Sequence, residues 1–374
     1  MIFGTAKKMQ KTKKIRGIFL NIIMLIIVVI VVIAALEIFT RLFLPQDLNY
    51  LQFDSNLRYK GVNNIETTFK TKEFNNTIKL NDKGLRDYNH DYESNKYRIL
   101  FLGDSMTFGY GVEAEETYPK VLEKILNEKN NSYETINAGI TAYNTAQELT
   151  YLETEGLKYK PNLVILGFML NDVSGNYFEG EAFDIENNKL KAKYPVYNFS
   201  FLSKIKNYLS THSHFARVIR KNLGLWSKMD ENKKVWNDRV IKTIAGINWN
   251  EMNASWNKTF LLINKMKEDL DKENIKLLVV VLPTKEQIDD KQLKEMVKDY
   301  KLNESEIKID NSQKIIGDYL KKNKIIFLDL FKDFKNADKN NDFYYDYDGH
   351  FNKNGHEFAA QIVYKRLKEI KITK

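Results

Sequence analysis

Cysteine is absent from the 374 residues of this chain, and histidine occurs only 5 times. Without cysteine there can be no disulfide bond, thiolate metal site, iron–sulfur cluster or cysteine nucleophile. The chain also has no P-loop sequence, and its one GxGxxA match, Gly109–Ala114, begins well after the preceding apolar run. A dinucleotide motif would begin where the strand ends. His212 and His214 have no suitable third ligand nearby in the sequence. We therefore expect neither a cofactor nor a metal ion.

Acidic residues are missing from the first part of the chain, where the first is Glu37. Most of the formal net charge of +9 comes from six residues in this region: Lys7, Lys8, Lys11, Lys13, Lys14 and Arg16. The rest of the chain is close to neutral and does not have the basic surface that a phosphate backbone requires. Nucleic acid is therefore not an expected partner.

A long apolar run follows these basic residues, from Ile18 to Leu36, with Asn21 as its only polar side chain. Its length suits a helix that crosses a membrane. The basic tail, 1–16, predicts a cytoplasmic N-terminus, so the chain beyond about residue 41 is expected outside. A cleaved signal peptide is the alternative, but its apolar run would be shorter and would end at a small-x-small site. We favour an uncleaved signal anchor at 17–40.

Short apolar runs alternate with amphipathic stretches through most of the remaining sequence. Strands are predicted at 97–102, 133–137, 162–168, 276–282 and 325–330, and helices at 116–128, 145–158, 256–273, 311–323 and 354–369. This alternation predicts an α/β domain, 96–372, with a parallel sheet covered by helices on both faces. Residues 41–95 are interpreted as a stalk and preface to the domain. Residues 173–255 are interpreted as a helical insertion whose tryptophans pack in its core.

Candidate site residues follow three successive predicted strands, in Gly103–Ser105, Asn137–Gly139 and Gly167–Asp172. Ligands of such sheets bind beyond the carboxyl ends of the strands. A serine at a sharp turn can act as a nucleophile, while a glycine amide or an asparagine side chain can stabilise an oxyanion. Each turn taken alone is equally well explained as an ordinary connection between a strand and a helix.

A base for the serine is sought among the five histidines. Of these, only His350 has a carboxylate two residues upstream in a glycine-containing loop, Asp346–Asn352. Such a carboxylate could orient the ring and stabilise its protonated form. His356 falls on the predicted last helix, where we expect it to pack.

These four segments, in this order, resemble blocks I, II, III and V of the SGNH/GDSL hydrolase family. LNDKGLRD, followed by YRILFLGDSMTFGYG, is similar to the openings of exported bacterial members. The resemblance implies a three-layer, flavodoxin-like doubly wound sheet. It also implies Ser105 as nucleophile, His350 as base, and an oxyanion hole formed by the amides of Ser105 and Gly139 with the Asn171 side chain.

The sequence departs from the family pattern at two places. Many members have an aspartate three residues before the histidine, where this chain has Tyr347, with Asp346 and Asp348 on either side. We favour Asp348, because its spacing resembles that of exported polysaccharide O-acetyltransferases in the same superfamily. Ala142 stands where many relatives have a second glycine.

The resemblance implies a serine-dependent O-acyl or acetyl esterase acting outside the membrane on carbohydrate or lipid esters of the cell envelope. An O-acyltransferase that modifies an exported polysaccharide would use the same residues. A membrane-tethered binding protein with the same fold and no catalysis is a third possibility. The sequence does not identify an acyl-donating partner.

Overall fold

The structure is a computed structural model that describes residues 2–187, 189–223, 231–337 and 342–372, and describes 2–14, 231–234 and 236 by their backbone only. The chain forms two compact units. Unit 1 comprises Met1–Asn49 and Ile205–Trp226, and unit 2 comprises Tyr50–Lys204 and Ser227–Lys374.

The centre of unit 2 is a five-stranded parallel sheet in the order β11-β10-β7-β5-β6. Its strands are β5 (Tyr97–Gly103), β6 (Tyr133–Asn137), β7 (Leu163–Phe168), β10 (Lys276–Val281) and β11 (Ile326–Asp329). Numbered along the chain, the order is 2-1-3-4-5, as in flavodoxin. The doubly wound sheet expected from the sequence is confirmed. Because β6 and β7 both flank β5, the turns that end these three strands lie at one edge.

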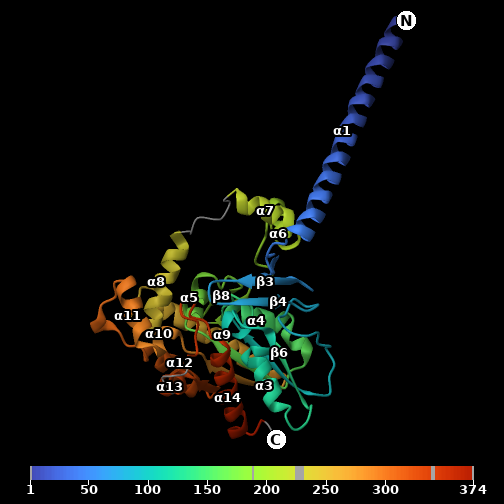
Figure 1. The fold of residues 1–374 in the computed structure, drawn as a ribbon. Coiled ribbons are helices and arrows are strands. Elements are labelled where there is room, and N and C mark those ends of the chain that lie inside the picture. Colours follow the sequence, from blue (N-terminus) through green and yellow to red (C-terminus); the bar gives the residue numbers. More distant parts are fainter. Residues whose placement is uncertain (1, 188, 224–230, 338–341, 373–374) are drawn as a thin grey trace. The chain divides into compact units, whose positions relative to one another are not determined.

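Helices cover both faces of this sheet (Figure 1). One face packs against α4 (Thr145–Thr154), α9 (Met252–Lys272) and α12 (Asn311–Lys322). The other packs against α3 (Tyr118–Leu126), α13 (Phe331–Asn336) and α14 (Lys353–Glu369). Successive strand residues point to opposite faces, so Leu100 joins the first layer while Ile99 and Phe101 join the second. The three-layer arrangement is confirmed.

Two β-hairpins precede the sheet. They are β1 (Leu51–Asp54) with β2 (Arg58–Gly61), and β3 (Glu66–Lys70) with β4 (Asn75–Lys79). Residues 50–95 belong to unit 2 and bury Leu57, Ile78, Leu80 and Leu85. This part of the segment interpreted as a stalk and preface therefore contributes to the body of the domain.

The connection from β7 to β10 contains α5 (Asn171–Phe178), α6 (Phe201–His212), α7 (His214–Asn222) and α8 (Glu231–Ala245). It also contains an antiparallel hairpin of β8 (Phe183–Glu186) and β9 (Lys189–Ala192), which the sequence did not predict. The hairpin is short and mostly exposed, so it lacks a clear apolar alternation. Trp256, on α9, is buried in the main core beside the sheet, and Trp249 is partly buried against that core, so these two do not fill a separate core of the insertion. Trp226 lies outside the described residues, as does the side chain of Trp236.

Unit 1 is built around α1 (Ile2–Phe43). Its portion Ile15–Phe43 is apolar and long enough to cross a membrane, by length and composition, and its most apolar stretch of 18 residues is not buried against the protein. Near its end, Glu37 accepts hydrogen bonds from the Ser213 hydroxyl at 2.7 Å and from the amides of His214 and Phe215, both at 3.1 Å. Glu37 thereby joins α1 to the start of α7, because the first amides of a helix have no acceptor within it.

Candidate active site

Ser105 is the first residue of α2 (Ser105–Phe108), directly beyond β5. Asp104 caps this short helix by accepting a hydrogen bond from the Met106 amide at 2.9 Å. A Cβ atom at Gly103 would lie 2.0 Å from the Thr107 hydroxyl, so only glycine permits so sharp a turn. The local sequence therefore places the Ser105 side chain at the carboxyl edge of the sheet.

The structure brings Ser105, His350 and Asp348 together. His350 Nε2 lies 2.7 Å from Ser105 Oγ, and its Nδ1 is hydrogen-bonded to Asp348 Oδ1. This geometry suits a neutral imidazole that donates its Nδ1 proton to Asp348 and accepts the serine proton at Nε2. The Asp346 side chain is 80% exposed, and its nearest cation is Lys285 at 4.0 Å. Of the two carboxylates that the sequence left open, the structure pairs Asp348 with the ring.

Two buried or half-buried charges hold the loop that carries this pair. The Glu73 carboxylate accepts hydrogen bonds from the amides of Tyr347 at 3.0 Å and Asp348 at 2.9 Å. Lys285, almost wholly buried, donates to the Asp346 carbonyl at 2.8 Å. Since both contacts are to the backbone, they fix the path of the loop and leave the Asp348 side chain to His350.

Aromatic contacts join this loop to the residues after the nucleophile. The Tyr345 hydroxyl donates to the Gly111 carbonyl at 2.7 Å. A Cβ atom at Gly111 would lie 2.6 Å from the Tyr345 ring, so the approach requires glycine. The Tyr110 ring lies 4.6 Å from the His350 ring, centre to centre. The imidazole is therefore packed on one side and has few alternative orientations.

The proposed donors to an oxyanion differ in their contacts. Asn171 lines the cleft and gives one amide hydrogen to Asp104 Oδ2 at 3.0 Å, which orients the group and leaves its second hydrogen. The Gly139 amide instead donates to Asn137 Oδ1 at 3.1 Å. A Cβ atom at Gly139 would lie 2.5 Å from the Phe108 amide nitrogen. Close packing against α2 thus accounts for this glycine independently of any oxyanion.

A cleft of about 1030 Å³ opens over Ser105 and His350. Ala142, with φ of 62°, lines it from the same turn as Gly139. The cleft is also lined by Arg58, 3.5 Å from Glu179, and by Arg239, whose guanidinium lies 3.8 Å from the centre of the Phe178 ring. Charged and aromatic groups together suit a polar substrate with many hydroxyl groups better than a long alkyl chain.

Arg86 is a residue of the site region to which the sequence assigned no role. It is fully buried and donates to the carbonyls of Gly109, Val112 at 2.5 Å and Thr77 at 2.8 Å. Burial lowers the pKa of Arg86 to about 10, so the guanidinium stays charged. These bonds fix the loop behind the nucleophile. In the sequence, this supporting role is indicated only by the position of Arg86 within the LNDKGLRD segment, which resembles the openings of exported family members.

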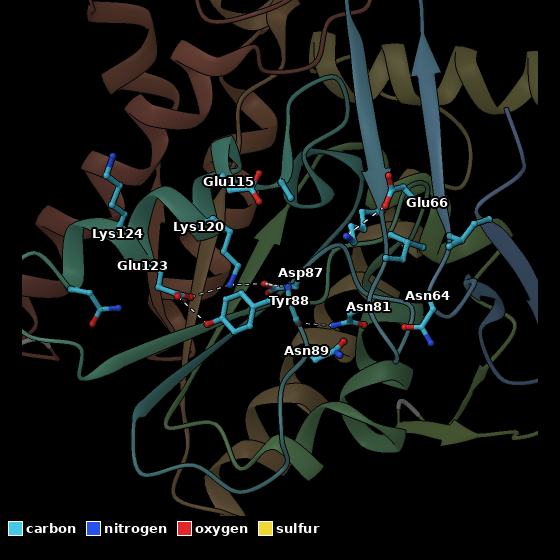
Figure 2. Close-up of a pocket in the computed structure, with 15 residues that line it drawn as sticks. Asn64, Glu66, Asn81, Asp87, Tyr88, Asn89, Glu115, Lys120, Glu123 and Lys124 are labelled. Atoms are coloured by element: carbon cyan, nitrogen blue, oxygen red, sulfur yellow. Dashed lines mark hydrogen bonds and ion pairs between the residues drawn. The ribbon is translucent and has the colours of Figure 1, made fainter. Parts of the chain in front are cut away.

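Asp87 fixes the neighbouring turn and forms part of a second cavity, of about 810 Å³ (Figure 2). Its Oδ2 accepts from the Asn137 amide at 2.8 Å, and its Oδ1 lies 2.7 Å from Lys120. In Figure 2, Lys120 also reaches Glu123, at 3.0 Å, and its ammonium group lies 4.1 Å from the Tyr88 ring centre. Since these charges compensate one another, the cavity wall is better explained as support for the Asn137 turn than as a charged ligand site.

Two further histidines of unit 2, His356 and His90, are buried. His356 is buried, accepts from the Tyr118 amide at 3.2 Å, and has its pKa lowered to about 3 by burial, so it packs as a neutral ring, as expected. His90 is buried with Asp87 and Glu134, whose carboxylates raise its pKa although burial opposes this. Within the described part of the chain, no group of three His, Cys, Asp or Glu side chains is placed to hold a metal ion.

Three buried carboxyl groups, Asp104, Glu148 and Asp172, lie behind the nucleophile. Burial raises the pKa of each, and the proximity of the other carboxyls adds to this for Glu148 and Asp172. Asn171 and the Met106 amide oppose the shift at Asp104. Protons are therefore retained in this cluster to a higher pH than in the unfolded chain.

Comparisons with known proteins agree with this arrangement. Residues 101–253 match the model of the GDSL-like Lipase/Acylhydrolase family, and residues 248–373 match a model described as SGNH hydrolase-like domain, acetyltransferase AlgX. An uncharacterised protein of Mycoplasma pneumoniae is 28% identical over 195 residues, which are 51% of this chain and 20% of that protein. The chain thus matches about a fifth of that relative's length.

Similar solved structures have low sequence identity. An acetyl xylan esterase, AlAXEase, is 20% identical with a TM-score of 0.40, covering 72% of this chain and 99% of its own. A lipase/acylhydrolase from Enterococcus faecalis is 15% identical with a TM-score of 0.40, covering 73% and 95%. The family assignment rests on the two family models, which together extend across the sheet and include Ser105 and His350. The chain belongs to the SGNH/GDSL hydrolase superfamily of serine esterases and acyltransferases.

Proposed function

We propose that this protein cleaves O-acyl esters through an acyl-enzyme on Ser105. His350 takes the hydroxyl proton as Ser105 Oγ bonds to the acyl carbon, and then gives that proton to the departing alcohol. Water, deprotonated by His350, releases the acid and restores the serine. The contact of 2.7 Å between His350 Nε2 and Ser105 Oγ, with Asp348 on Nδ1, carries the proposal.

The developing negative oxygen is proposed to bind the Asn171 side chain and the Ser105 amide. Ser105 begins α2, and the first amides of a helix are free of intrahelical acceptors. The Gly139 amide would have to leave Asn137 to contribute. We therefore assign Gly139 a smaller part than Asn171.

The direct test is turnover of an acetyl ester by the full chain in detergent, wild type beside Ser105→Ala. The expected loss is about 10⁴-fold or more in kcat, by analogy with other triads. Ser305→Ala, at an exposed position, is the matched control and should keep the wild-type rate. Equal rates for wild type and Ser105→Ala would remove Ser105 as nucleophile.

Acyl transfer is a second candidate, because the part of the chain that contains Asp348 and His350 matches the acetyltransferase model. The acyl-enzyme would then pass its acyl group to a sugar hydroxyl in place of water. Supplying an acyl-ester donor with and without an acceptor polysaccharide separates the two reactions. Acceptor-dependent product would favour transfer, whereas an unchanged rate of acid release would favour hydrolysis.

The site is proposed to act outside the cytoplasmic membrane on carbohydrate or lipid esters of the cell envelope. The apolar helix Ile15–Phe43 and the basic tail before it support this placement. A non-catalytic tethered protein with this fold should not react with a fluorophosphonate probe. Labelling that is lost in Ser105→Ala would therefore exclude that alternative.

A further inference from the structure

Helix α6 has an unusual distribution of side chains across its two faces. Ser210 and Thr211 are buried and Asn207 is half-buried, so the face turned to the protein is polar. Ile205, Tyr208 and Leu209 are 39%, 62% and 41% exposed. Their spacing of three and four residues places them in one stripe along the helix. This helix therefore exposes the face that a soluble helix would bury.

Burial of this polar face costs little free energy, because its polar groups form hydrogen bonds. The Thr211 hydroxyl lies 3.1 Å from the Asn207 carbonyl and 2.9 Å from that of Tyr208, so its hydrogen bonds stay within α6. The Ser210 carbonyl accepts from the Asn49 amide at 3.0 Å. The chain that leaves α1 is thus fastened to this face of α6, which leaves the apolar stripe to an external surface.

The corner between α6 and α7 is attached to the end of α1. Arg41 donates to the His212 carbonyl, Glu37 caps α7, and the Gln46 amide donates to His214 Nδ1 at 2.8 Å. Glu37 and Arg41 lie in the last two turns of the apolar helix. A bilayer crossed by α1 would therefore have its surface at the level of this corner.

The charge of the two helices fits an anionic lipid surface. Residues 201–223 contain Lys204, Lys206, Arg217, Arg220 and Lys221 and no Asp or Glu. Ile219 on α7 and Leu223, the residue after this helix, are 40% and 65% exposed. Apolar side chains with basic neighbours are typical of helices that lie in the plane of a membrane interface.

We propose that α6 and α7 lie on the outer surface of the membrane, with Ile205, Tyr208 and Leu209 inserted among the lipid headgroups. The inference rests on the proposed membrane anchoring by α1. A lipid surface is favoured over a protein partner because the stripe is joined to the membrane-crossing helix and its surroundings are basic.

The absence of cysteine allows a clean test in the full chain. Three single-cysteine variants, Tyr208→Cys, Tyr300→Cys and Leu25→Cys, carry an environment-sensitive fluorophore in vesicles of phosphatidylcholine and phosphatidylglycerol. Lipids with a nitroxide near the headgroup end of the acyl chain act as quenchers. Tyr300, an exposed aromatic residue of unit 2, is the matched control, and Leu25 reports on α1 itself.

We expect the label at 208 to be quenched at least threefold more strongly than the label at 300, and less so in vesicles without phosphatidylglycerol. Equal quenching at 208 and 300, with the label at 25 quenched, would overturn the inference and leave the anchor intact. No quenching at 25 would refute the anchor together with the inference. Unquenched labels at 208 that transfer energy to one another would assign the stripe to a second copy of the chain and would also overturn it. Unchanged acetyl-ester turnover shows that each variant is folded.

Discussion

Asp346 and Asp348 stand two residues apart in the same loop but have different surroundings. Asp348 bonds the His350 ring, while the Asp346 side chain is 80% exposed. Asp348→Asn should therefore lower kcat by about 10³ to 10⁴, because an amide at this position favours the wrong tautomer of the imidazole. Acetyl-ester kinetics on the full chain provide the measurement.

Asp346→Asn is the matched control for this prediction and should stay within about twofold of the wild-type rate. A loss at Asp346 as large as that at Asp348 would mean that the loop adopts another register in the working enzyme. The substitution should leave the fold intact, since it keeps the hydrogen bond from Lys285 to the backbone carbonyl of residue 346.

Glu148 is fully buried and, among the described residues, neither of its carboxylate oxygens has a hydrogen-bond partner. Its pKa is raised well above 4.5 by burial and by Asp172. The folded protein therefore binds a proton that the unfolded chain releases, and the stability this provides is lost as the pH rises above about 4.5. Glu148→Gln should become more stable relative to wild type as the pH increases from 5 to 8.

Urea denaturation at pH 5 and pH 8 measures this difference in the free energy of unfolding. Glu295→Gln, at an exposed position of α11 (Asp290–Asp299), is the control and should show little change between the two values of pH. If the Glu148→Gln difference were the same at both, the carboxyl would be ionised in the folded protein.

At the scale of elements, the hairpin of β3 and β4 positions the catalytic loop. Its turn is closed by the Thr71 amide, which donates to the Phe74 carbonyl at 2.9 Å, and Glu73 extends from it to the amides of Tyr347 and Asp348. Glu73→Ala should lower kcat by about tenfold with little change in KM, because the His350 loop becomes less ordered.

Glu73→Gln should recover part of this loss, since its amide oxygen can still accept one of the two hydrogen bonds. Glu66→Ala, an exposed position of β3, controls for damage to the hairpin itself. A rise in KM without a fall in kcat would contradict a positioning role for Glu73.

The elements that the sequence predicted well are those with a local pattern. Continuous apolar strands and amphipathic helices appear where their periodicity indicated. The candidate site followed from them, because Ser105 comes just after β5 and His350 just before α14. Glu73, Arg86 and Asp87 were missed as supports because they contact backbone atoms of distant segments, which leaves no periodic signal. Nothing in the sequence indicated that the Gly139 amide would bond to Asn137.

At the scale of the whole molecule, the chain interleaves its two units. Residues 205–223, which lie between β9 and α8 in the sequence, belong to unit 1 together with α1. Residues 50–95 belong to unit 2 and support its active-site turns. Deleting the N-terminal helix would thus remove the partner of α7 as well as the proposed anchor. The sequence predicted the tail, the anchor and the domain as separate segments. It did not indicate that α1 pairs with α7, because this pairing depends on hydrogen bonds between Glu37 and amides far away in the sequence.

The orientation proposed for the chain across the membrane, with the basic tail in the cytoplasm, can be measured with single cysteines. We expect Tyr300→Cys to react with a membrane-impermeant maleimide in intact cells, and Thr5→Cys to react only after permeabilisation. The cysteine-free wild type gives the background. The reverse labelling pattern would place the catalytic unit inside the cell and remove envelope esters as substrates. A shorter Thr5→Cys product that takes up no maleimide even after permeabilisation would show that the apolar helix is a cleaved signal, because only residues beyond the cleavage point would remain.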